Sequence, residues 1–451
     1  MVDRTQLARL GLFDAKVPRY TSYPTAPHFA GGVGPDRFVE WIESIPEYGN
    51  ISLYLHVPFC RRLCWFCACR TQGTATLSPV EAYVGTLLQE LAMLRKHLPK
   101  GVKLSRLHWG GGTPTLLTPD MMTRLIAGIR ETADFADNAE FSVEIDPNEI
   151  DADRLKALAA GGMNRASIGV QDFDEQIQET IGRPQSYDLT KQAVEMIRET
   201  GVTSLNADIL FGLPHQTNAK ITETVQKLLS FTPDRVALYG YAHVPWMAKR
   251  QQLIPSEALP APDERLALFE TARKLFMWDG YDEIGIDHFA IKSDGLSVAQ
   301  KTGHLRRNFQ GYTDDTADVL IGLGASSISK FPQGFAQNAS ATSAHTGKIR
   351  DGVFSTARGH AFSQDDMLRS RLIEAIMCDF RIEAAEIINT FDISRAALFD
   401  MLNAANSQFE GILEVTEEGL FVPQNARVLT RLIARSFDAY DLSKAGHSSA
   451  I

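Results

Sequence analysis

The stretch Cys60-Arg61-Arg62-Leu63-Cys64-Trp65-Phe66-Cys67-Ala68-Cys69 holds four of the five cysteines of the chain, and Cys378 lies far from it. The first three cysteines have the spacing C-x3-C-x2-C. Thiolates bind zinc, copper(I) and iron–sulfur clusters. Structural zinc takes four ligands, often as two pairs, and no second Cys or His pair follows at zinc-finger spacing. The stretch therefore favours a cluster over zinc or a thiol redox site, and three cysteines would leave one iron of a four-iron cluster open.

Strands and helices alternate along the chain after residue 50. We expect strands at residues 51–56, 104–109, 141–145, 166–170, 204–210 and 236–241. Helices are expected between them, at about 78–98, 118–130, 152–160, 187–200 and 220–230, the first opened by a capping box of Ser78 and Glu81. Such alternation predicts a parallel sheet with crossover helices. The fold class is therefore α/β, with six units forming a partial (β/α)6 barrel.

Polar or glycine-rich residues follow these strands, where barrels of this kind carry their functional groups. They are Gly110-Gly111-Gly112-Thr113, Glu144, Gln171, Asp208 and Ala242-His243. Each also has an ordinary interpretation. The glycines alone would more often form a tight turn, and a strand-end carboxylate is often a partly buried salt-bridge partner.

The chain divides into three predicted regions. Residues 1–50 are expected to be an extended lead-in, rich in Pro and aromatic residues around 17–29. Residues 51–360 form the catalytic domain, with the barrel core at about 51–245 and a less regular extension. Residues 361–451 form a mostly helical, winged-helix-like domain with a hairpin at 413–422 that turns near Gly419. Ser363 and Asp366 cap a helix of that domain, in which Cys378 is expected to be a buried structural thiol.

The composition excludes several classes of protein. A net charge of −10 argues against a general nucleic-acid surface. No run of about 20 apolar residues is present, so we expect no transmembrane helix. The start of the chain lacks the apolar core of a signal peptide. Clustered thiols in such a chain fit a reducing cytoplasm better than a disulfide framework.

The cysteine stretch, preceded by His56-Val57-Pro58-Phe59, resembles the cluster motif of radical S-adenosylmethionine enzymes. Its fourth cysteine makes it similar to the oxygen-independent coproporphyrinogen III oxidases, and so does Asn308-Phe309-Gln310-Gly311-Tyr312. The family usually has Gly-Cys-Asn where this chain has Ala68-Cys69-Arg70. The resemblance runs from Arg19 into the C-terminal region.

The resemblance implies a set of site residues. Cys60, Cys64 and Cys67 would hold a [4Fe–4S] cluster, and Cys69 would stay off it. Two molecules of S-adenosylmethionine would be bound by Tyr54, Phe66, Gly111, Gly112, Thr113, Glu144, Gln171, Arg183, Asp208, Ala242 and Ile328. Cys69, Gln310 and Tyr312 would take part in catalysis. Without the resemblance, Arg183 would be an exposed helix-end cation, Ile328 a core residue, and Arg306-Arg307 either a solvated patch or carboxylate partners.

The resemblance also implies an activity. The propionate side chains of coproporphyrinogen III would be decarboxylated twice, through a 5′-deoxyadenosyl radical, to give protoporphyrinogen IX in porphyrin and haem biosynthesis. A reduced flavodoxin- or ferredoxin-like donor would supply electrons to a monomeric enzyme. Two alternatives stay open. A haem-binding chaperone of the superfamily would lack the fourth cysteine and the Asn-Phe-Gln-Gly-Tyr segment, and a haem-opening radical methyltransferase would share the cysteine loop.

Overall fold

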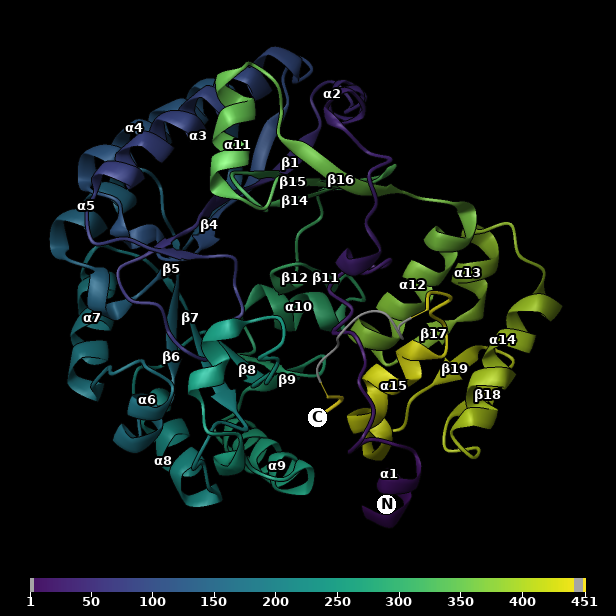
Figure 1. The fold of residues 1–451 in the computed structure, drawn as a ribbon. Coiled ribbons are helices and arrows are strands. Elements are labelled where there is room, and N and C mark those ends of the chain that lie inside the picture. The colour runs from purple at the N-terminus through teal and green to yellow at the C-terminus, as the bar shows by residue number, and fades with distance from the viewer. Residues whose placement is uncertain (1–3, 442–448) are drawn as a thin grey trace.

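The computed structural model describes residues 4–441 and 449–451. A sheet of twelve strands forms the centre of this part of the chain (Figure 1), in the order β16-β15-β14-β13-β1-β4-β5-β6-β7-β8-β10-β9. Seven neighbouring strands run parallel: β13 (Val319–Leu323), β1 (Asn50–Val57), β4 (Lys103–Gly111), β5 (Asp134–Ile145), β6 (Arg165–Gln171), β7 (Ser204–Phe211) and β8 (Arg235–Gly240). The predicted α/β class and parallel barrel are therefore confirmed.

Helices connect the parallel strands and cover the outer face of the sheet (Figure 1). They are α3 (Ser78–His97), α4 (Pro119–Thr132), α5 (Ala152–Ala160), α6 (Glu175–Thr180), α7 (Tyr187–Glu199), α8 (Asn218–Leu229) and α9 (Pro262–Trp278). Polar caps fix where several of them begin. The side chains of Thr118, Asp151, Ser186 and Thr217 each accept a hydrogen bond from a backbone N–H of the first turn. The apolar faces of these helices and the strands share one core.

The sheet is wider than the six predicted strands. No strand was predicted in the less regular extension after residue 245, but β13 pairs in parallel with β1. An antiparallel extension follows on that side: β14 (Ile328–Phe331), β15 (Gly334–Asn338) and β16 (Thr356–Ala361), with α11 (Thr342–Arg350) between the last two. At the other edge are β10 (His288–Ala290) and β9 (Asp282–Ile284), which run antiparallel to their neighbours.

One predicted local feature is wrong. Ser78 does not open a capping box, because Leu77 is the N-cap of α3 and no side chain caps the helix; Pro79 lies at its start. The predicted hairpin is confirmed, and it turns next to Gly419, between β18 (Glu414–Thr416) and β19 (Gly419–Phe421). Gly419 begins the second strand with φ +143°, and a Cβ there would collide with the carbonyl oxygen of Ile382.

The first 50 residues are not wholly extended. They contain α1 (Arg4–Arg9) and α2 (Pro35–Glu43). Phe38, Trp41 and Ile42 of α2 pack into the core of the sheet. An earlier part of the segment packs elsewhere, since Leu7, Leu12, Val17, Tyr20 and Tyr23 belong to the core of the C-terminal region. The N-terminal segment therefore joins the two cores.

The C-terminal region has its own core, formed by α12 (Gln364–Asp379), α13 (Ala384–Thr390), α14 (Arg395–Gln408), α15 (Thr430–Arg435) and a small sheet of order β17 (Arg381–Glu383)-β19-β18. Ser363 and Asp366 form the predicted capping box, and Cys378 is fully buried as expected. The region boundaries at 50 and 360 stay predictions. None of the described helices is both long and apolar enough to cross a membrane.

Candidate active site

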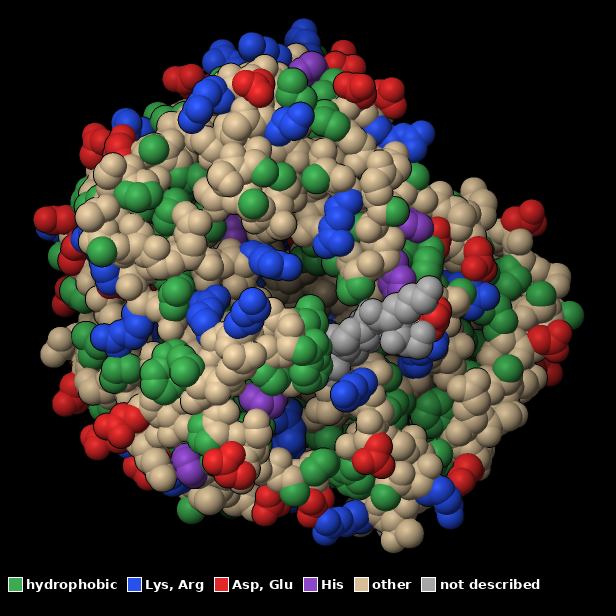
Figure 2. Space-filling model, viewed as in Figure 1, with side chains coloured by type: hydrophobic (Ala, Val, Ile, Leu, Met, Phe, Trp, Pro, Cys, Tyr) green, Lys and Arg blue, Asp and Glu red, His purple; other side chains and the backbone are tan. Residues whose placement is uncertain are grey.

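A cavity of about 860 Å³ lies inside the barrel and extends to the carboxyl ends of the parallel strands. Figure 2 shows a hollow near the centre of the molecule, with Lys and Arg side chains gathered around it. Of the predicted site residues, the cavity wall contains Tyr54, Phe66, Cys67, Cys69, Gly111, Glu144, Asp208, Ala242, Gln310, Tyr312 and Ile328. The other six, Cys60, Cys64, Gly112, Thr113, Gln171 and Arg183, do not line it.

Polar side chains point into the barrel from alternate positions of each strand. The pattern is clearest in β1, with Ser52, Tyr54 and His56, and in β5, with Glu140, Ser142 and Glu144, all of which line the cavity. At the amino-terminal ends of the strands, charged side chains form a layer of ion pairs. It includes Arg106–Glu140, Arg106–Asp314, Arg165–Glu140 and Arg235–Asp294. Parallel strands buried on both faces are usually apolar throughout, so a two-residue polar period was the signal that could have found His56, His108 and Ser142.

Glu144 lies near the carboxyl end of β5, and its carboxylate interacts with two neighbouring residues. The backbone N–H of Gly111 donates to its Oε2 at 3.1 Å, and Nε2 of His108 lies 3.4 Å from its Oε1. Burial alone would raise the pKa of Glu144, but these hydrogen bonds lower it overall. Its side chain is still 43% exposed because it faces the cavity. Glu144 is therefore an ionised acceptor at neutral pH.

The pKa of Asp208 on β7 is shifted in the opposite direction to that of Glu144. Burial raises its pKa to about 6, although the side chain of Asn206 donates a hydrogen bond to its Oδ1 at 2.9 Å. Asn206 also donates to Ser167 Oγ at 2.8 Å, which fixes the amide between two strands. The cavity thus carries two carboxyl groups of different acidity.

The glycine run after β4 packs directly against the cysteine loop. The N–H of Gly112 donates to Val57 O and that of Thr113 to Phe59 O, both at 2.8 Å. A Cβ at Gly112 would lie 2.6 Å from the Phe59 oxygen and 3.0 Å from Cys60 Sγ. The loop itself is held by β2 (Phe59–Cys60), which pairs in parallel with β3 (Gln72–Gly73).

Arg183 is buried beside the cysteine loop instead of being an exposed cation. Its Nη1 lies 3.4 Å from Cys64 Sγ and its Nη2 donates to Gly169 O at 3.1 Å. Gln171 converges on the same point, because a Cβ at Gly169 would lie 3.0 Å from Gln171 Nε2 and 3.2 Å from Arg183 Nη2. Arg183 therefore contacts the loop at Cys64, and Gln171 lies beside Arg183 near Gly169.

Two residues outside the predicted set fasten the loop to the region after β8. Gln251 is fully buried, and its Nε2 donates to Phe66 O at 2.7 Å and to Ala242 O at 3.0 Å. Arg250 Nη2 donates to Thr71 Oγ1 at 3.0 Å and to Cys69 O at 3.3 Å. They lie in a short 3-10 helix (Lys249–Leu253) about 180 residues from the loop, and no sequence signal marks the contact.

The thiols of the loop differ in acidity. Burial raises the pKa of Cys60 to about 11 and also raises that of Cys64, against the positive charge of Arg183. Cys67 and Cys69 form a coupled pair. A hydrogen bond from Cys69 lowers the pKa of Cys67 to about 6, and the same bond raises the pKa of Cys69. Cys67 is therefore the thiolate of the pair and Cys69 its donor.

The cysteine loop can supply three thiolates to one site. Cys60, Cys64 and Cys67 lie close enough for their charges to affect one another's pKa values. A four-iron cluster takes its thiolates at separate irons. With Arg183 offering positive charge to Cys64, the donor set suits a cluster of thiolate ligands.

Gln310 and Tyr312 belong to a ribbon of β11 (Arg306–Asn308) and β12 (Gly311–Thr313), beside α10 (Gly295–Lys301). Gln310 lies in the turn and lines the cavity. The hydroxyl of Tyr312 points away, because it donates to Met377 O at 2.7 Å and accepts from Ile286 N at 3.1 Å. The ring of Tyr312 therefore meets the cavity, and the catalytic assignment of both residues stays a prediction.

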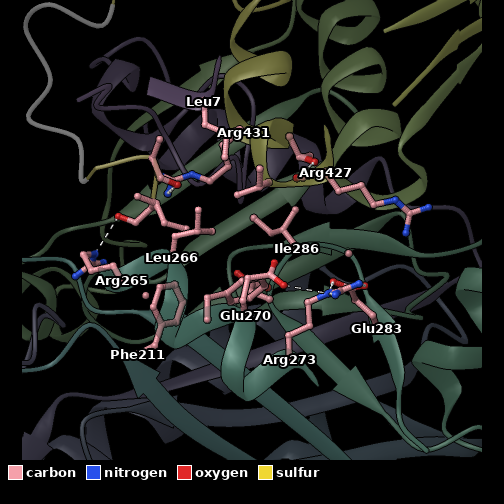
Figure 3. Close-up of a pocket in the computed structure, with 18 of the residues that line it drawn as sticks. Leu7, Phe211, Arg265, Leu266, Glu270, Arg273, Glu283, Ile286, Arg427 and Arg431 are labelled. Carbon is pink, nitrogen blue, oxygen red and sulfur yellow. Dashed lines mark hydrogen bonds and ion pairs between the residues drawn. The ribbon is translucent and has the colours of Figure 1, made fainter. Parts of the chain in front are cut away.

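A second cavity of about 650 Å³ lies between α9 and the C-terminal region. Figure 3 shows Arg265 and Arg273 entering it from one side and Arg427 and Arg431 from the other. Arg273 is paired with Glu283 at 2.7 Å. Arg19, Gly240 and Tyr241 line both cavities, so the two spaces adjoin.

Comparison with known proteins identifies the family. Residues 54–228 match the Radical SAM superfamily. The oxygen-independent coproporphyrinogen III oxidase of Paracoccus denitrificans is 64% identical over 452 residues, covering 100% of both chains. That of Escherichia coli is 37% identical over 441 residues, covering 97% of this chain and 96% of its own.

The fold agrees with a solved structure over almost its whole length. Coproporphyrinogen III oxidase from Escherichia coli, described as a radical SAM enzyme, matches with a TM-score of 0.90 at 35% identity, covering 95% of this chain and 100% of that chain. Radical SAM enzymes use a [4Fe–4S] cluster and S-adenosylmethionine, for which the loop and cavity are suited. The chain belongs to the oxygen-independent coproporphyrinogen III oxidases, a family of the radical SAM superfamily.

Proposed function

We propose that this protein converts two propionate side chains of coproporphyrinogen III to vinyl groups, giving protoporphyrinogen IX in haem biosynthesis without oxygen. Each conversion removes one hydrogen atom from the carbon next to the ring, one molecule of carbon dioxide and one electron. The observation that carries this proposal is the common wall of one cavity, which contains Cys67 and Cys69 of the cluster loop together with the two strand carboxyls Glu144 and Asp208.

The protein's own residues position and enclose the reactants. When bound, the cluster and S-adenosylmethionine supply a radical that abstracts hydrogen. Glu144, ionised and held by Gly111 N–H, can accept hydrogen bonds from an ammonium group or ribose hydroxyls. The glycines let backbone N–H groups approach a bound molecule closely. Tyr54 and His108, stacked at 5.8 Å between ring centroids, give the cavity a rigid aromatic side.

We also propose that two molecules of S-adenosylmethionine are bound, one using Glu144 and the other Asp208. The two carboxyls stand on strands separated by β6, and their acidities differ. Glu144→Ala and Asp208→Ala are each expected to lose one equivalent of bound S-adenosylmethionine while the cluster spectrum stays unchanged. Equilibrium dialysis under anaerobic conditions measures this. Two equivalents bound at wild-type affinity in either variant would remove that assignment.

The electron donor, the oligomeric state and the cellular compartment of the enzyme are proposed as follows. A reduced flavodoxin- or ferredoxin-like protein is the proposed electron donor, because each turnover begins with a one-electron reduction. The monomeric state is proposed for the chain as well. Five cysteines without a disulfide support a reducing, cytoplasmic setting.

Anaerobic product analysis tests the activity. The reconstituted wild-type protein, a reductant and S-adenosylmethionine should convert coproporphyrinogen III to protoporphyrinogen IX through a three-propionate intermediate, as followed by mass spectrometry. Cys60→Ser should form no product. Tight haem binding without any turnover would favour a haem chaperone instead, and methylation or opening of haem would favour a radical methyltransferase.

A further inference from the structure

Arg307 is a buried cation on the wall of the main cavity. Its side chain is only 3% exposed and lines the cavity. Within residues 4–441 and 449–451, its Nε and Nη1 have no hydrogen-bond partner. The third nitrogen, Nη2, lies 3.7 Å from Asp287 Oδ2, which is too long for a hydrogen bond. Buried guanidinium nitrogens are normally satisfied, so this group lacks an acceptor that a ligand can supply.

The buried groups around Arg307 also carry more positive than negative charge. Arg19 and Arg307 are both close enough to Asp287 to interact with its charge. Burial alone would raise the pKa of Asp287, but Arg307, His288 and Arg19 lower it to about 2. One ionised carboxylate therefore faces two buried guanidinium groups. Burying positive charge without enough negative charge is costly, and a further anion would reduce that cost.

Arg307 is also held rigidly. Its guanidinium lies over the ring of Tyr312, 4.4 Å from the centroid. Hydrogen bonds to Met377 O and from Ile286 N fix the Tyr312 hydroxyl in turn. His288, whose Nδ1 lies 2.6 Å from Asp287 Oδ1, holds that carboxylate on the other side. A guanidinium fixed in this way loses little conformational freedom when it binds a ligand.

We propose that Arg307 binds a carboxylate of the tetrapyrrole substrate, an inference that rests on the proposed function. A carboxylate can accept from Nη1 and Nη2 together, which is the paired geometry that arginine favours. The bound group is a propionate that stays on the ring while another propionate reacts. Arg307 therefore selects tetrapyrroles with an ionised side chain at that position and orients the macrocycle.

The neighbouring arginine provides a matched control. Arg306 precedes Arg307 on β11, but successive strand residues face opposite sides. Its side chain is 39% exposed, lies 3.9 Å from Glu374 Oε2 and is absent from the cavity wall. Arg306→Gln removes the same charge from the same strand without changing the proposed subsite.

The test measures binding of coproporphyrin III, the oxidised and non-reacting form, and of its tetramethyl ester to the anaerobic holoenzyme. The wild type should prefer the acid. Arg307→Gln should weaken binding of the acid about 10- to 100-fold, the range expected for loss of a charged hydrogen-bonded pair, and leave the ester unchanged. Arg306→Gln should behave as the wild type does.

Equal weakening of acid and ester, or no change for the acid, would overturn the proposal. If Arg307→Gln does not accumulate as folded protein, Arg307→Lys decides, because it keeps the charge but cannot form the paired contact. It should keep full iron content and lose most of the preference for the acid; an intact preference would count against the subsite. Turnover of coproporphyrinogen III by the wild type is measured in parallel, so a failure of the proposed function is seen separately.

Discussion

Two carboxyl groups of one cavity differ in acidity because their neighbours differ. Glu144 accepts from a backbone N–H and faces His108, which keeps it ionised. Asp208 has one amide donor, and burial raises its pKa. A binding site thus gains a charged and a partly protonated carboxyl from the same kind of strand-end position.

Asp208→Asn should raise the free energy of unfolding at pH 7. With the pKa raised from 3.8 to about 6, the native state binds the proton more tightly, so stability is lost as pH rises from about 4 through 6. The gain is at most about 3 kcal/mol, and less because the cavity admits water. Chemical denaturation of the cluster-free protein at pH 4 to 7 measures it.

Glu144→Gln is the matched comparison. The pKa of Glu144 is lowered, so its charge stabilises the native state above the unfolded pKa and the substitution should reduce stability at pH 7. Effects of the same sign in both variants would contradict the electrostatic explanation.

Cys69→Ser should keep the cluster and lose the product. Cys69 lies on the cavity wall, its N–H donates to Cys67 Sγ at 3.3 Å and Arg250 holds its carbonyl oxygen. These contacts aim the residue at the cavity beside Cys67, a proposed cluster ligand. Iron and sulfide content and the absorption spectrum should be normal, while formation of protoporphyrinogen IX falls severely. A loss of iron equal to that of Cys67→Ser would make Cys69 a ligand.

At the scale of elements, α3 is joined to the β13–β15 sheet edge by a buried polar contact. Glu90 is fully buried and accepts from Gly324 N at 2.8 Å and Asn338 Nδ2 at 3.0 Å. Burial raises its pKa to about 8, and burial lowers that of His345, 3.5 Å away, to about 4. The pair is therefore neutral near pH 7, with the proton on Glu90.

The free energy of unfolding should fall less between pH 6.5 and 8 in Glu90→Gln than in the wild type. Between pH 6.5 and 8 the native state keeps a proton that the unfolded chain has lost, so Glu90 makes stability fall as pH rises. His345 is neutral in the native state there, and its partial charge in the unfolded chain near pH 6.5 is common to both proteins. The wild type should lose about 2 kcal/mol more than the variant across this interval. Urea denaturation at pH 6.5 and 8 measures the free energy of unfolding of both proteins. An equal change of that free energy with pH in the two proteins would show that Glu90 is ionised in the native state.

The sequence predicts the elements that depend on local pattern. Strand–helix alternation placed all six barrel strands, and Ser363 marked the start of α12. It could not place β13, because that strand comes about 80 residues after β8 yet pairs with β1. Pairing of distant strands leaves no local trace.

The candidate site shows the same division. The cysteine motif and strand-end residues were found from spacing, and 11 of the predicted residues meet at the cavity. Gln251 and Arg250 were missed, because nothing in the sequence of this short 3-10 helix indicates which loop it contacts. The buried state of Arg183 was also invisible, since it depends on the tertiary position of Cys64.

At the scale of the whole molecule, Arg431 ties the two ends of the described chain together. It donates to Pro18 O at 3.1 Å, Ser449 O at 2.9 Å and Ala450 O at 3.0 Å, and also to Val17 O. Ala450 N in turn donates to Ala15 O at 2.8 Å. The N-terminal segment, which continues to Arg19 at the cavities, is thus fixed on the C-terminal region.

Arg431→Gln should loosen this connection. Several backbone carbonyls lose a charged donor, so the C-terminal region should be destabilised by about 2–4 kcal/mol. Hydrogen exchange of the Ala450 amide should become faster, as measured by mass spectrometry. Arg395→Gln, on the exposed face of α14, is the control. Unchanged exchange at Ala450 would show that Arg431 does not hold the ends together.

Gly110, Gly111 and Gly112 have a consequence for how this enzyme can evolve. At Gly112 a side chain meets backbone, and at Gly111 the φ of +117° disfavours one, so replacements there should not fold correctly. At Gly110 a Cβ would come 2.7 Å from Glu144 Oε1, a side-chain atom that can move. A folded but inactive Gly110→Ala is therefore expected. Glycine is therefore expected to be retained at all three adjacent positions. Folding requires it at Gly111 and Gly112, and activity requires it at Gly110.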